Sequence, residues 1–228
     1  MNLDGILYQA SVWILPALVA ITLHEAAHGW VAWRLGDDTA YRMGRVSFNP
    51  LRHVDNFGTI VLPLMLLLAR APFMFGWAKP VPVNFGRLNS PRRDMVLVAA
   101  AGPGMNIGLA FVALLLLHAV NWVPEPASLW LADNLINAIQ LNIVLAVFNL
   151  LPLPPLDGGR IAVGLLPNSL AIPLARTERY GLAIILALLF LVPWIGAQMG
   201  FVFDPLRWIL GPPVDFLIRW LAVLSGQI

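Results

Sequence analysis

The chain has 228 residues, of which 59% are hydrophobic and only 11% charged, with a formal net charge of +2. A soluble domain carries about 25% charged residues, so most of this surface is expected to face lipid. The small charge, and the absence of a basic run interleaved with aromatic residues, argue against a nucleic-acid partner. No cysteine is present, so any metal must be bound by His, Asp, Glu or backbone oxygen.

Long uncharged stretches between ionised residues predict the membrane helices. The first has no basic segment before it, so we expect it to remain as a membrane helix rather than to be removed as a signal peptide. A C-terminal stretch, 206–224, is apolar but interrupted by charges and prolines, and is a weaker candidate. The other four are near or above the ~20 residues that a helix needs to cross a bilayer: 5–24, 95–124, 134–156 and 180–203.

The segment between the first two long stretches has a different character. Its apolar run, 56–69, has only 14 residues, which suits a re-entrant or interfacial segment. Basic residues flank the run on both sides, which predicts a cytoplasmic location and an external N-terminus. Residues 44–50 and 79–85 alternate polar and apolar side chains, with prolines that suit an edge strand. We therefore expect an all-α polytopic membrane protein with about five to six membrane helices, a short re-entrant or interfacial segment and small β-like stretches.

The strongest local motif is His24-Glu25-Ala26-Ala27-His28 at the end of the first stretch. On a helix, His24 and His28 share one face and can hold a single Zn²⁺, and the adjacent Glu25 can act as a general base. An alternative is that both histidines are merely solvated near the surface. Ionisable groups at membrane depth cost roughly 3 kcal/mol or more, which favours the metal-binding interpretation.

A catalytic zinc usually has three protein ligands, and Asp157 is the best candidate for the third. It follows 23 uncharged residues and three prolines that interrupt the helix, and such breaks occur in membranes only beside protein or a water-filled cavity. The structural role for Asp157 is an N-cap of a helix beginning near Gly158, and the two roles are compatible because they can use different oxygens of one carboxylate. His53 is expected to be solvated or to order its loop, and His118 to be interfacial on the far side. If 56–69 does not cross, Asp157 emerges on the same face as the two histidines.

Three elements together resemble the site-2 protease family of intramembrane zinc proteases. They are His24 to His28, Gly102-Pro103-Gly104-Met105-Asn106, and Asn149 to Gly158, which match H-E-x-x-H, G-P-x-x-N and N-x-x-P-x-x-x-x-D-G in the same order. The resemblance implies hydrolysis of peptide bonds in membrane-spanning protein substrates. It implies one zinc ion per chain, bound by His24, His28 and Asp157. Glu25 would activate water and Asn149 would steady the substrate carbonyl.

The resemblance is to a compact bacterial branch of the family, with no PDZ or nucleotide-sensing domain. It implies one integral-membrane domain, 1–228, with a catalytic core at about 6–165 and accessory C-terminal helices at about 177–225. The protein is expected in a bacterial cell membrane, with the site toward the cytoplasm. In the middle helix, Gly102, Pro103 and Asn106 are expected to serve packing and hydrogen bonding. The sequence carries no signal for a particular substrate, a cleavage trigger or an oligomeric state.

Two other functions compete with proteolysis. A membrane zinc carrier also places His and Glu one turn apart, but it needs a second His- or Glu-bearing helix, which the other stretches do not offer. A non-catalytic scaffold would more readily have lost Glu25 or a ligand. For a protease, a substrate helix must unwind, and an exposed strand near 44–49 or 79–85 could hold the unwound chain by strand addition. The alternative for these segments is a membrane-surface loop.

Overall fold

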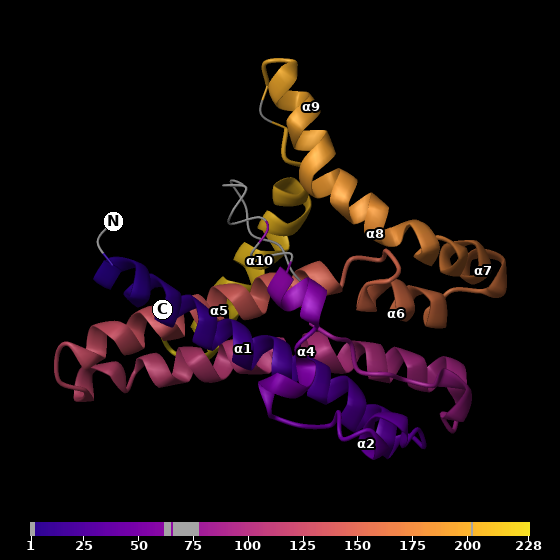
Figure 1. Ribbon diagram of the computed structural model, residues 1–228, viewed down its shortest axis with the longest axis horizontal. Coiled ribbons are helices and arrows are strands. Elements are labelled where there is room, and N and C mark those ends of the chain that lie inside the picture. The colour runs from indigo at the N-terminus through magenta and orange to yellow at the C-terminus, as the bar shows by residue number, and fades with distance from the viewer. Residues whose placement is uncertain (1–2, 62–64, 66–77, 202) are drawn as a thin grey trace.

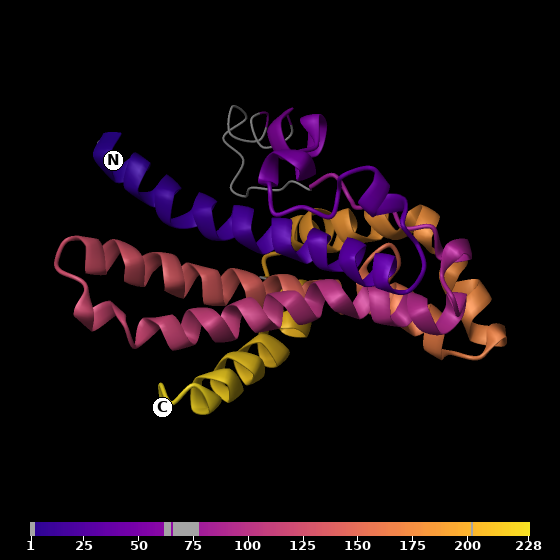
Figure 2. The same cartoon turned by 90° about the horizontal axis from the view of Figure 1, so that it is seen from below.

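The computed structural model describes residues 3–61, 65, 78–201 and 203–228. Three long helices lie side by side at its centre: α1 (Leu3–Arg34), α4 (Pro91–Leu117) and α5 (Ala127–Asn149). Helix α4 runs antiparallel to the other two (Figures 1 and 2). A long apolar helix satisfies its own backbone hydrogen bonds, which is the requirement for any segment in lipid. This three-helix bundle carries the candidate site.

Small residues allow the helices of the bundle to approach closely. Ala20 and Ala32 of α1 and Ala110 of α4 are fully buried, and membrane helices commonly pack through such residues. Larger side chains of α5 fill the space on the other side of α4, where they meet the C-terminal helix. That cluster contains Ala110, Ala113, Leu114, Leu135, Ile139, Ile143, Val147, Leu221 and Ala222.

Several short helices and turns lie around the end of the bundle at which α1 finishes (Figure 1). Helices α6 (Asp157–Leu165) and α7 (Asn168–Arg176) follow α5, and the loops before α4 contain α2 (Thr39–Arg42) and the short turns η1 (Pro50–His53), η2 (Asn56–Val61) and η3 (Phe85–Arg87). A further turn, η4 (Val120–Trp122), joins α4 to α5. Helices α8 (Glu178–Leu186) and α9 (Val192–Gln198), joined by η5 (Ala187–Leu191), project away from the bundle (Figure 1). Helix α10 (Pro205–Leu224) packs back against α5.

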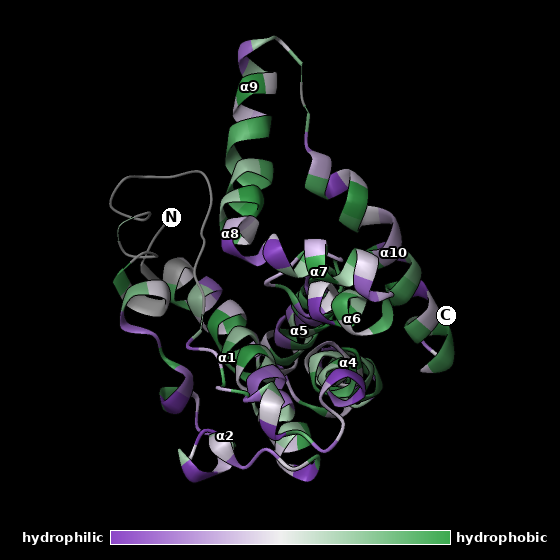
Figure 3. Cartoon of the chain, turned by 90° about the vertical axis from the view of Figure 1, so that its right-hand side faces the viewer, coloured by the Kyte–Doolittle hydropathy of each residue, from purple (hydrophilic) through white to green (hydrophobic). Residues whose placement is uncertain are grey.

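Among the residues that the structure describes, four helical stretches are long and apolar enough to cross a membrane: Leu7–Arg34, Pro91–Leu117, Ala127–Asn149 and Glu178–Gln198. They correspond to the four stretches predicted from the sequence, and they make this a multi-pass membrane protein. Helix α10 is not among the four, because Arg207, Asp215 and Arg219 interrupt it. Hydrophobic residues make up most of α8 and α9 in Figure 3. Trp194 of α9 has 60% of its surface exposed. That surface suits contact with lipid.

The prediction of β-like stretches was wrong for the residues that the structure describes. Neither 44–50 nor 79–85 forms a strand. Pro80 and Pro82 have no N–H group to donate to a ladder. The N–H groups of Val81 and Asn84 bind side-chain carboxylates on other parts of the chain instead of a neighbouring strand.

The apolar run 56–69 is described only in part, since 62–64 and 66–69 lie outside the described residues. Its first residues form the π-helical turn η2. The residues that flank the whole segment meet, because the Lys79 N–H donates a 2.8 Å hydrogen bond to the His53 carbonyl. His53 and Lys79 therefore lie on the same side of the molecule.

Candidate metal centre

Helix α1 presents two imidazoles to the interior of the bundle. His24 and His28 are separated by one helical turn, and only 8% and 9% of their surfaces are exposed. Their Nε2 atoms lie 3.0 Å apart. The rings meet edge to face, with centroids 4.7 Å apart, so both Nε2 atoms point into one small volume.

Asp157 enters the same volume from the start of α6. Its Oδ2 atom lies 3.3 Å from Nε2 of His24 and 3.4 Å from Nε2 of His28. Helix α6 begins at Asp157 itself with Leu156 as the N-cap residue, so the structural role of Asp157 as the cap is not supported. The next two residues, Gly158 and Gly159, lie directly against the backbone of the proline-rich turn, where any side chain would collide. This close approach is what brings the carboxylate back to α1.

The hydrogen-bond partner of Nδ1 determines which nitrogen of each imidazole carries the proton. Nδ1 of His28 is 2.7 Å from the Val98 carbonyl, which can only accept, so this nitrogen carries the proton. Nδ1 of His24 lies 2.6 Å from Oδ1 of Asn106, with the same consequence. Each neutral imidazole therefore directs the lone pair of its Nε2 at the other and at Asp157.

Three acceptor atoms thus face one another without a donor between them. Oδ2 of Asp157 is one of the few buried polar atoms in the described residues that lack a hydrogen-bond partner, and a cation placed among the three atoms would satisfy them all. The site therefore favours positive charge. Two imidazoles and one carboxylate form a donor set that suits zinc, and the three ligand atoms lie within 4.8 Å of one another.

Gly102 of α4 has no side chain, and the imidazoles of His24 and His28 occupy the space that a side chain would fill. A Cβ atom added there would lie 2.5 Å from Cε1 and 2.6 Å from Nε2 of His24, and closer still to Nε2 of His28. Any side chain at this position would enter the metal site. From the sequence we expected Gly102 to serve helix packing, whereas its neighbours are the two imidazoles themselves.

Glu25 lies beside the cluster and contacts a different part of the chain. Its Oε2 atom accepts a 2.7 Å hydrogen bond from the Val81 N–H. Gly29, one turn further along α1, gives room for the Val81 side chain, whose Cγ1 would be 3.0 Å from a Cβ at that position. The Asn84 N–H is bound in turn by the fully buried Asp37, at 2.6 Å. The segment from Val81 to Asn84 is thereby held across α1 at Glu25.

Three other residues singled out from the sequence lie outside the cluster. The Asn149 side chain donates to the Leu145 carbonyl of its own helix, at 3.0 Å. His53 is buried rather than solvated, and its Nε2 binds the Ser47 carbonyl at 3.0 Å, which agrees with the loop-ordering role. His118 binds the Ser225 carbonyl at the C-terminal end of α4, away from the metal site.

Sequence reasoning missed Asn142 on α5. This residue is 2% exposed and binds Asn106, the partner of His24. An asparagine in the middle of an apolar helix is the signal that could have found it, because buried amides require hydrogen-bond partners.

A buried His–His–Asp cluster within a bundle of apolar helices defines a polytopic membrane metalloprotein. Comparison with known proteins gives the family. The family model of peptidase family M50 matches residues 125–192, which include Asp157 but not the α1 motif. The chain belongs to this family, which is the site-2 protease family of zinc metalloproteases.

Similarity to individual relatives covers most of the chain. This chain is 43% identical to YwhC of Bacillus subtilis, a predicted zinc metalloprotease. The alignment has 184 residues and covers 79% of this chain and 80% of YwhC. The chain is 31% identical over 211 residues to Rip2 of Mycobacterium tuberculosis, a predicted zinc metalloprotease, over 92% of this chain and 72% of the relative. Rip2 of Mycolicibacterium smegmatis is 31% identical over 173 residues, which cover 75% of this chain and 64% of that protein. No solved structure gives a significant match.

Proposed function

We propose that His24, His28 and Asp157 hold one zinc ion and that Glu25 is the general base of an intramembrane endopeptidase. The observation that carries this assignment is the meeting of three buried acceptor atoms with no donor between them. Glu25 follows His24 in the sequence and is only half-buried. Its carboxylate is not one of the three acceptor atoms of the cluster. Its carboxylate is therefore available for proton transfer.

Zinc in such a site supplies a Lewis acid that polarises a carbonyl group and makes water a stronger nucleophile. Glu25 takes the proton from the attacking water and returns it to the leaving amine. The Val81 N–H fixes the direction of the Glu25 carboxylate through its hydrogen bond. Asn149 is the last residue of α5 and uses one Nδ2 hydrogen on the Leu145 carbonyl; the other would bind the carbonyl oxygen of the scissile bond.

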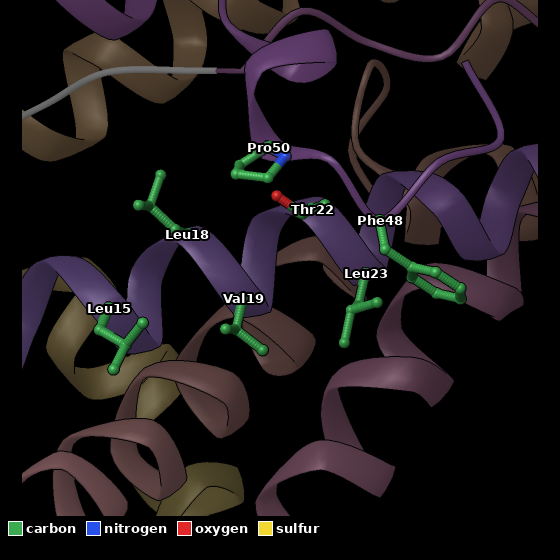
Figure 4. Close-up of a pocket in the computed structure, with 7 residues that line it drawn as sticks. All are labelled: Leu15, Leu18, Val19, Thr22, Leu23, Phe48 and Pro50. Carbon is green, nitrogen blue, oxygen red and sulfur yellow. The ribbon is translucent and has the colours of Figure 1, made fainter. Parts of the chain in front are cut away.

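Transmembrane proteins are the proposed substrates. An apolar groove of about 530 Å³ follows one side of α1. Figure 4 shows four apolar side chains of α1 in this groove, with Pro50 above Thr22 and Phe48 beside Leu23. The groove reaches Leu23, the residue before His24. A helix arriving through lipid can lie along this side of α1, and its unwound end then reaches the segment at Val81 and Glu25.

The membrane arrangement follows from charge and length. Basic residues gather in the loops at the site end of the bundle, which supports a cytoplasmic location for the site in a bacterial cell membrane. Helix α10 is 20 residues long and serves as a fifth span, with its charged residues at protein or headgroup contacts. The chain then forms one integral-membrane domain, with its core at about 6–165 and accessory helices at about 177–225.

The deciding experiment compares membrane-protein fragments in cells that express the wild type, Glu25→Gln or the control Glu125→Gln. Glu125 is exposed and precedes α5 at the opposite end of the bundle. We expect fragments in the wild type and in the control but none with Glu25→Gln, which keeps its zinc. A zinc carrier would instead show altered metal flux with an unchanged fragment pattern. A scaffold would show neither difference, and both of these outcomes would contradict the proposal.

A further inference from the structure

A chain of three buried polar side chains links three helices and ends at His24. It begins on α5 with Asn142, whose Oδ1 accepts a 2.7 Å hydrogen bond from Nδ2 of Asn106. Asn106 of α4 is fully buried, and its Oδ1 lies 2.6 Å from Nδ1 of His24 on α1. Asn142 belongs to none of the three sequence motifs of the site.

The groups around these two amides fix the direction of each hydrogen bond from Asn142 through Asn106 to His24. The Ala138 carbonyl can only accept, so Asn142 binds it with Nδ2, at 2.8 Å, and turns Oδ1 toward Asn106. Asn106 meets that oxygen with Nδ2, which also binds the Ala20 carbonyl at 3.3 Å. Its own Oδ1 must then face His24, and His24 must carry its proton on Nδ1.

We propose that Asn142 is a positioning residue for the metal centre, which acts through Asn106 to fix the tautomer and orientation of His24. Without the Asn142 oxygen, the longer bond to Ala20 is the remaining contact that orients Asn106 Nδ2. A rotated Asn106 amide would offer N–H to Nδ1 of His24 and move the imidazole proton to Nε2, where it would block metal binding. Groups that orient metal-binding histidines typically change metal affinity by about 10- to 100-fold when removed.

The same helix offers a matched control at Asn134. This residue is 6% exposed, and its Nδ2 binds the carbonyl four residues earlier, at Trp130, with a length of 2.8 Å. Its Oδ1 has no partner within the described part of the chain. Asn134 therefore shares the burial and the helical hydrogen bond of Asn142 but lacks the connection to His24.

Zinc affinity, measured by chelator competition on the purified full chain, tests the proposal, which rests on His24 being a zinc ligand. We expect Asn142→Leu to bind zinc about 10- to 100-fold more weakly than the wild type, and Asn134→Leu to bind it equally well. In an Asn106→Leu background, Asn142→Leu should have no further effect, because the link is already broken. Unchanged affinity in Asn142→Leu, or an additional loss in the double variant, would overturn the role of Asn142. A wild type that binds no zinc would overturn the metal site as well.

A second measurement needs no variant. The chain has four histidines, so nitrogen NMR of histidine-labelled, metal-free protein can resolve His24 at a pH above the usual histidine range. We expect the His24 proton on Nδ1 in the wild type and a shift toward Nε2 in Asn142→Leu, with no shift in Asn134→Leu. A His24 proton on Nε2 in the wild type would refute the proposal, whether or not Asn142→Leu folds.

Discussion

The backbone N–H of Val81 donates a 2.7 Å hydrogen bond to the Glu25 carboxylate. These residues are far apart in the sequence, yet the contact places the segment from Val81 to Asn84 directly beside the proposed general base. The Asn84 N–H is held by Asp37 in the same way, so two carboxylates of the α1 region fix this segment.

Replacement of Val81 by Pro removes the N–H that orients Glu25. Hydrogen bonds to charged groups contribute about 1.5–3 kcal/mol, so we expect turnover to fall about 10-fold or more with zinc content unchanged. Val81→Ala keeps the N–H and should retain most of the turnover. Full activity of Val81→Pro would show that this bond does not orient the catalytic carboxylate.

Val83→Pro tests a separate hypothesis, that the segment from Val81 to Asn84 pairs with an unwound substrate. This variant leaves the hydrogen bond between Val81 and Glu25 in place, so we expect cleavage to fall only if the substrate pairs there. Unchanged cleavage would exclude pairing at Val83.

Gly102→Ala should destroy the metal site without disturbing the helix. The added Cβ would overlap both imidazoles, whereas alanine favours a helix by about 1 kcal/mol over glycine. The control is Gly104→Ala on the same helix, where a Cβ meets nothing within 4 Å. Zinc analysis of the purified variants should find metal in Gly104→Ala and little in Gly102→Ala. Equal zinc in the two would contradict the observed geometry.

Asp157→Asn should separate metal binding from folding. The amide removes one acceptor from the cluster and offers N–H groups to the two Nε2 atoms, so the metal-free protein should be at least as stable as the wild type. Zinc-linked stabilisation, about 4 kcal/mol at a thousandfold excess over Kd, should disappear. Thermal unfolding with and without a chelator measures both effects. A chelator should lower the Tm of the wild type but not of Asp157→Asn, and an equal decrease in both would count against Asp157 as a ligand.

Charge gaps in the sequence located the long helices but not their ends. The third uncharged stretch was expected to begin at 134, after Asp133, whereas α5 begins at Ala127. Asp133 is accommodated inside the helix because it accepts a 2.6 Å hydrogen bond from the Tyr8 hydroxyl of α1. Such a partner lies 125 residues away in the chain, and no local pattern reveals it.

The candidate site was more predictable than its surroundings. His24 and His28 are brought together by helical spacing alone, and Asp157 follows from the proline break and the expected topology. The contact between Gly102 and the imidazoles depends on how α4 is rotated against α1. The link through Asn142 depends in turn on how α5 meets α4. The β-like pattern at 79–85 misled because alternation gives no information on whether backbone N–H groups bind a strand or a carboxylate.

Zinc K-edge X-ray absorption on the purified chain tests the central claim most directly. The account predicts one zinc per chain with two imidazole nitrogens and carboxylate oxygen at about 2.0–2.2 Å. His28→Ala should remove one imidazole from the spectrum or abolish binding, while Glu25→Gln should leave the spectrum unchanged. A zinc shell without two imidazoles, or a spectrum that His28→Ala does not alter, would contradict a metal centre built from His24, His28 and Asp157.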